Sequence, residues 1–212
     1  MTHFGTPTLA LIASSCLSLI GTNALAESTY GYSPAGTGAI TANARVDLEI
    51  NVPKLILLRV GSDGATINKL TWNAGPTWAA APSTLPSTDV SNQANSWDGA
   101  APTAGTIATQ TAVAAFAWTN SSGGGSLAYT ATAFAATPAA AVGPALGDIT
   151  VTSAAGLAHP VPAVLATAST TPTTFGKNTL ASGSWTYALG GTPATWSSGQ
   201  YTSRITYTAS SL

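Results

Sequence analysis

The chain has 212 residues, a formal net charge of −1 and only 6% charged residues, against about a quarter in an ordinary soluble domain. A net charge so close to zero gives no electrostatic attraction toward nucleic acid or an anionic lipid surface, which excludes a nucleic-acid-binding role. No segment after the first 26 residues approaches the roughly 18 consecutive apolar residues of a membrane-spanning helix.

Residues 1–26 have the pattern of a cleaved signal peptide. An apolar stretch runs from Leu9 to Ile20, and alanines stand at the −3 and −1 positions before Glu27, where a signal peptidase requires small residues. The segment before the apolar stretch departs from the pattern because it contains no Lys or Arg. We therefore expect export to the periplasm, the cell surface or the extracellular space.

The only cysteine, Cys16, lies inside this segment. Cleavage after Ala26 would leave a chain without disulfides, thiolate nucleophiles or thiolate metal ligands. Ala13-Ser14-Ser15 before the cysteine weakly resembles a lipoprotein signal, so lipidation of Cys16 stays open.

Residues 27–39 are rich in Gly, Ser and Pro without periodicity, which predicts a flexible leader. We expect the folded domain to cover residues 40–212. In residues 45–52, apolar and polar side chains alternate strictly, which predicts a half-buried strand that ends at Pro53. The apolar set of this strand is Val46, Leu48, Ile50 and Val52.

Residues 55–60 form a short apolar run, which predicts a strand buried on both faces. After a Gly-Ser-Asp-Gly turn, residues 65–72 are expected to form a strand with a bulge. Residues 73–105 contain four prolines and several glycines. They predict a long loop or insertion.

The rest of the chain alternates between period-two segments and turn residues. Residues 127–134 are expected to pair with the preceding strand as a hairpin, across a glycine-rich turn at 120–125. The pattern as a whole predicts an all-β fold, a single Ig-like antiparallel β-sandwich without helices. The further predicted strands are 106–118, 127–134, 148–152, 184–189 and 201–209.

Groups capable of catalysis are few. His159 is the single histidine after the predicted cleavage site, and one histidine without cysteines cannot build a metal cluster. Asp47 and Glu49 share a strand face, but Arg45 lies on the same face, which favours a solvated surface over a glycosidase pair. We predict a loop position for His159, and no catalytic residue, metal site or cofactor.

Six tryptophans divide between predicted strands and loops. The strand tryptophans, which we expect in the core, are Trp72, Trp118 and Trp185. The loop tryptophans, which could stack on sugar rings or cover the end of the domain, are Trp78, Trp97 and Trp196.

The C-terminal segment opens with a glycine and a tyrosine and then alternates. Gly199 is the fourteenth residue from the end. This segment resembles the closing strand of bacterial pilin-like and spore-coat-U-like secreted β-sandwich proteins. The residues that carry the resemblance are Gly199, Tyr201, Ile205, Tyr207 and Ala209. Ser211 replaces the penultimate aromatic residue, the cysteine pair of such subunits is absent, and similar openings occur in WxL-type cell-wall proteins.

The resemblance implies an incomplete sandwich that accepts a strand from a neighbouring subunit. Residues 45–52 would be the donated strand and residues 27–44 its tether; alternatively, residues 45–52 are the first strand of their own sandwich. We therefore expect a secreted non-catalytic structural protein, a cell-surface or pilus/filament-like subunit that pairs by strands with itself or with another surface subunit. The alternative is a glycan-binding module that holds polysaccharide with its loop tryptophans.

Overall fold

The computed structural model describes residues 27–212 except 83–84, 140–141 and 155. The predicted signal peptide, with Cys16, lies outside the described residues. The chain divides into two units, Met1–Val52 and Pro53–Leu212. No helix in the described part of the chain has the length and apolar character needed to cross a membrane.

The fold is all-β. The described residues form strands and two short 3₁₀ turns, η1 (Leu146–Asp148) and η2 (Pro193–Thr195), and they contain no α-helix. The strands are β1 (Ile56–Val60), β2 (Pro76–Thr77), β3 (Thr103–Ala104), β4 (Val113–Thr119), β5 (Gly125–Ala131), β6 (Ala135–Thr137), β7 (Ile149–Ser153), β8 (Thr173–Phe175), β9 (Ala181–Leu189), β10 (Gln200–Thr202) and β11 (Ile205–Ser211).

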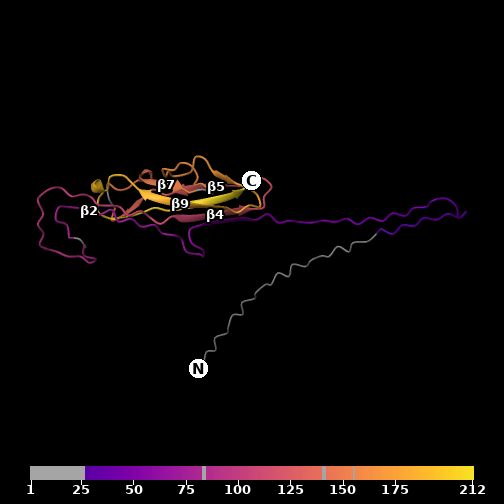
Figure 1. The fold of residues 1–212 in the computed structure, drawn as a ribbon, viewed down its shortest axis with the longest axis horizontal. Helices are drawn as coiled ribbons and strands as arrows, with labels where there is room; N and C mark the ends of the chain where they lie inside the picture. Colours follow the sequence, from indigo (N-terminus) through magenta and orange to yellow (C-terminus); the bar gives the residue numbers. More distant parts are fainter. Residues whose placement is uncertain (1–26, 83–84, 140–141, 155) are drawn as a thin grey trace, which may run out of the picture. The chain divides into compact units, whose positions relative to one another are not determined.

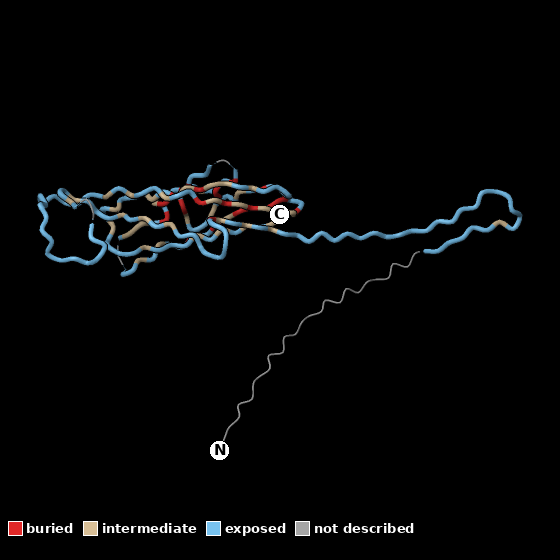
Figure 2. The backbone as a smooth tube through the Cα atoms, turned by 60° about the horizontal axis from the view of Figure 1, so that its bottom comes forward, coloured by how far each residue is buried: buried red, intermediate tan, exposed pale blue. Residues whose placement is uncertain are grey.

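Two antiparallel sheets contribute to one buried core. The first has the strand order β1-β4-β9-β7 and the second the order β11-β5-β8. Figure 1 labels β4, β7 and β9 of the first sheet and β5 of the second. Two smaller antiparallel pairs, β2–β3 and β10–β6, lie outside these sheets. The buried residues gather on the strands of the two larger sheets (Figure 2).

Period-two burial is clearest in β4 and β5, where alternate residues are fully buried. Trp185 of β9 is completely buried and confirms the expectation of a core tryptophan. Trp118 lies on the opposite face of β4 from the buried residues and is only half-buried. Trp72 belongs to no strand and is half-buried against the core.

The strand predicted over residues 45–52 is not formed. These residues belong to no sheet, and their apolar side chains are exposed (Figure 2). The exposed fractions are 70% for Val46, 89% for Leu48, 86% for Ile50 and 76% for Val52. The alternation is therefore present without the partner strand that turns it into a half-buried ladder.

The predictions for residues 55–60 and 65–72 both need correction. Residues 56–60 do form β1, but its side chains alternate between half-buried and exposed, with Leu57 at 54% exposed. The predicted burial on both faces is wrong because one face of β1, with Leu57 and Arg59, is exposed and only the other packs against the core. Residues 65–72 form no strand, although Leu70 packs against the core.

In the predicted long loop, 73–105, the described residues (all except 83–84) form no strands besides the two-residue pair β2–β3. The predicted strand 106–118 begins later, at Val113. Residues 106–112 carry no strand, and the side chain of Gln110 donates instead to the Thr71 carbonyl.

The predicted hairpin between β4 and β5 is wrong. β4 pairs with β1 and β9, whereas β5 pairs with β11 and β8. The backbone groups of both strands are satisfied by partners distant in sequence. The turn at 120–124 therefore carries the chain from one sheet to the other.

The predicted final strand, 201–209, is two strands. The break falls at Ser203 and Arg204, where the Ser203 hydroxyl donates to the Thr132 carbonyl and the Arg204 amide donates to the Thr132 hydroxyl oxygen. β10 pairs with β6 and β11 with β5.

Candidate functional site: an open edge of the core

Metal-ligating side chains do not cluster. In the part of the chain that the structure describes, no group of three or more His, Cys, Asp or Glu side chains could hold a metal ion. Glu49 accepts a hydrogen bond from the Asn51 side chain at 3.0 Å, and both residues are exposed. The only imidazole in this part of the chain belongs to His159.

His159 lies outside any strand, as predicted, but it is buried, which the sequence did not indicate. Its Nε2 atom lies 2.7 Å from the hydroxyl of Tyr207, and that hydroxyl lies 2.6 Å from the hydroxyl of Tyr187. The ring also packs 5.1 Å from the ring of Trp185. This aromatic cluster connects β11 to the centre of the core.

Burial sets the protonation of the cluster. It lowers the pKa of His159 to about 4, against a smaller opposing effect of a backbone hydrogen bond at Pro160. Burial raises the pKa of Tyr187 to about 12 and raises the pKa of Tyr207 as well. All three groups are therefore neutral near pH 7, which suits a structural network better than proton transfer.

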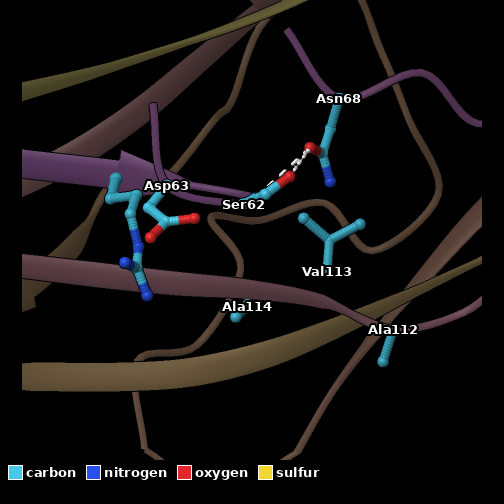
Figure 3. A pocket seen from close by; sticks show the side chains of 8 residues that line it. Ser62, Asp63, Asn68, Ala112, Val113 and Ala114 are labelled. Atoms are coloured by element: carbon cyan, nitrogen blue, oxygen red, sulfur yellow. Dashed lines mark hydrogen bonds between the residues drawn. The ribbon is translucent and has the colours of Figure 1, made fainter. Parts of the chain in front are cut away.

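A shallow pocket of about 410 Å³ lies beside the end of β1 (Figure 3). Asn68 closes one side by accepting hydrogen bonds from the amide and the hydroxyl of Ser62. Arg59 also lines the pocket, and its guanidinium stacks over the ring of Phe116 at 4.2 Å. The pocket is open and its charges are of both signs, since Asp63 lines it too.

The main feature of the domain is an edge where the core is open. β1 and β11 are end strands of their sheets, and they contact each other. Their inward-facing side chains are only half-buried, although all of them except Ser211 pack against the core. On β1 these are Ile56, Leu58 and Val60, and on β11 they are Ile205, Tyr207, Ala209 and Ser211.

The opposite edge is covered by the chain itself. Residues 163–165 pair with β7, and Leu165 donates its amide to the Ile149 carbonyl at 2.9 Å. Residues 167–169 then bond to β5, where Ser169 donates its amide to the Tyr129 carbonyl. We call residues 161–171 the strap. The inward-facing Ile149 and Val151 of β7 are consequently only 3% and 2% exposed.

The residues predicted for assembly fall into three places. Gly199 precedes β10, and Tyr201 of β10 donates its hydroxyl to backbone carbonyls at Val142 and Ser197. Ile205, Tyr207 and Ala209 line the open edge on β11. The apolar residues of segment 45–52 are exposed and unpaired with any strand.

The loop tryptophans differ in exposure. Trp97 is 57% exposed and donates its indole N–H to the Ala100 carbonyl within its own loop. Trp78, next to β2, and Trp196, next to η2, are half-buried. β3 pairs with β2 and contacts η2, so Trp78 and Trp196 adjoin elements of one region.

Comparisons with protein-family models, with curated proteins and with solved structures found no match for this chain.

Proposed function

We propose that this protein is an exported, non-catalytic structural subunit whose Ig-like β-sandwich lacks one edge strand. Residues 45–52 of one copy fill the open edge of the next copy, which builds a filament or surface polymer. The single observation that carries the proposal is the coexistence of an open edge between β1 and β11 and an exposed, strictly alternating segment of the same chain.

The two surfaces are complementary in pattern. Segment 45–52 offers four apolar side chains at every second position, and β11 presents four inward-facing residues at every second position. An added strand would satisfy the free backbone groups of β11 and place its apolar side chains against the half-buried side chains of the edge. Complete burial of each such side chain contributes about 1.5–3 kcal/mol, which offsets the cost of association and ordering.

The polar face of the segment supports the same arrangement. Arg45, Asp47, Glu49 and Asn51 would remain in water when the apolar face is buried. An exposed apolar stripe on an exported chain otherwise favours aggregation. A defined acceptor for that stripe resolves this conflict.

The test is the assembly state of the processed protein. We expect polymers by size-exclusion chromatography with light scattering and by electron microscopy. The variant Ile50→Asp should abolish assembly because a carboxylate cannot enter the apolar core. The matched control Asn51→Asp changes the neighbouring residue on the polar face and should assemble normally. A wild-type protein that is folded and strictly monomeric would refute the proposal.

Glycan binding by the loop tryptophans stays a second prediction because Trp97 exposes more than half of its indole. Retention of the wild-type protein on immobilised polysaccharide, lost in Trp97→Ala, would support it. No retention of the wild type would end it.

A further inference from the structure

The connection between segment 45–52 and β1 is very short. Only Pro53, Lys54 and Leu55 separate Val52 from the first residue of β1. Segment 45–52 could therefore occupy the open edge of its own domain only by reversing direction within these three residues and running antiparallel to β1. A segment running parallel to β1 would need a crossover of about a dozen residues or more.

Asn120 holds these three residues. Its side-chain Oδ1 accepts the Leu55 amide at 2.7 Å, and its Nδ2 donates to the Pro53 carbonyl at 2.7 Å. The Leu55 carbonyl also accepts the Asn120 amide and the Thr119 hydroxyl, the latter at 2.9 Å. Residues 53–55 are thus attached to the end of β4 as a continuation of β1, and a reversing turn there would break these bonds.

Like charges also disfavour closure of the open edge by the segment of the same chain. β1 is antiparallel to β4, the 120–124 turn reverses the chain into β5, and β5 is antiparallel to β11, so β1 and β11 run oppositely. In a self-closed arrangement, segment 45–52 would run parallel to β11. If its four apolar residues are matched to the four inward-facing residues of β11, Val46 would lie beside Ile205. Arg45 would then lie opposite Arg204, and like charges opposite each other destabilise a strand pair.

We propose that Asn120 is a positioning residue that prevents segment 45–52 from closing its own open edge and so commits it to a second copy. The donated strand then runs antiparallel to β11, with Val52 beside Ile205 and Arg45 at the far end from Arg204. This inference rests on the proposed function. It adds that segment 45–52 fills the open edge of a second copy and that it runs antiparallel to β11 there.

Engineered cysteines test the direction. With Cys16→Ser as background, the introduced thiols are the only ones in the chain. In the proposed direction, Asn51 lies opposite Thr206, and in the self-closed direction it lies opposite Ser210. All three are outward-facing positions, and opposed residues meet the Cα spacing of a disulfide.

Chains carrying Asn51→Cys are mixed with chains carrying Thr206→Cys or Ser210→Cys and oxidised. We expect the Thr206 pairing to give the interchain dimer at roughly tenfold higher yield, because Ser210 lies four residues further along β11, about 13 Å away, which exceeds disulfide reach. If the protein assembles but the Ser210→Cys mixture gives more interchain dimer than the Thr206→Cys mixture, the inference is wrong and the proposed function is not affected. No cross-link in either mixture, with monomers in solution, overturns both.

Asn120 is tested in single chains that carry both Asn51→Cys and Ser210→Cys. With Asn120 present we expect no intrachain disulfide. Asn120→Ala should produce it and raise the monomer fraction several-fold, and Asn120→Asp, which keeps one acceptor, should give an intermediate result. Gln110→Ala removes a comparable amide bond elsewhere and should change neither. If Asn120→Ala retains its thermal midpoint and assembles without the intrachain disulfide, Asn120 has no such role.

Discussion

The two edges of the core differ in whether another segment of the chain covers them. At the β7 edge, the strap bonds to strands of both sheets and leaves the inward-facing residues fully buried. At the β1–β11 edge, equivalent inward-facing residues remain half-buried, and the Tyr207 hydroxyl adds side-chain hydrogen bonds to the backbone ladder that joins β11 to β5. A strand of similar composition thus has a different burial depending on whether another segment covers it.

Two leucine-to-alanine substitutions, one at each edge, should measure this difference in burial as a difference in stability. Leu165 in the strap is 4% exposed, whereas Leu58 of β1 is half-buried. Leu165→Ala should lower the free energy of unfolding by about 3–4 kcal/mol, and Leu58→Ala by about half as much, in an Ile50→Asp background that keeps both proteins monomeric. Urea denaturation measures both, and equal costs would show that the two edges do not differ.

Tyr207→Phe should weaken the open edge from inside the core. The substitution removes the hydroxyl that contacts His159 and Tyr187, and it leaves both of their polar groups buried without that partner. We expect a loss of about 2 kcal/mol in unfolding free energy. Tyr201→Phe, which removes a more exposed tyrosine hydroxyl on β10, is the control and should cost less. The reverse order would contradict the cluster's role.

Acid should destabilise the domain through His159. Its pKa falls from 6.5 in the unfolded chain to about 4 in the folded one. Protonation therefore favours the unfolded state, and the stability that is complete above pH 6.5 is lost as the pH falls toward 4. Between pH 6.5 and 5.5 the unfolding free energy should fall by about 1 kcal/mol. The same titration of His159→Gln should lack this component; an identical slope would contradict the assignment.

Trp97→Ala should have the smallest effect. Its indole is exposed in the loop between β2 and β3 and lies far in sequence from both edges of the core. We expect less than about 0.5 kcal/mol of change in stability and unchanged assembly. Loss of assembly in this variant would place the interface at the loop and not at β11.

The all-β class and the positions of β4, β7, β9 and β11 follow from local patterns. Their buried residues recur with period two, and this periodicity is a property of each short segment alone. Ile205, Tyr207 and Ala209, which the resemblance predicts as part of an assembly strand, alternate with the same period in β11. Each prediction needed no knowledge of the partner strand.

Pairing could not be predicted in this way. Residues 45–52 alternate as regularly as any strand, and only the absence of a partner distinguishes them. Asn120 bonds to Leu55 across 65 positions, and Tyr207 contacts His159 across 48 positions. No local signal marks these residues, because the groups they bond to come near only when segments distant in sequence have paired or packed.

The attachment of residues 53–55 to Asn120 also defines how the domain would bear tension. A pull on the N-terminal segment would enter at Pro53 and Leu55 and pass at once to the end of β4, which lies between β1 and β9. A pull directed along β1 would load the hydrogen bonds of the β1–β4 and β4–β9 pairs together. Inter-strand hydrogen bonds that are loaded together resist rupture far better than bonds that are opened one at a time. The mechanical strength of such a subunit would therefore depend on β4.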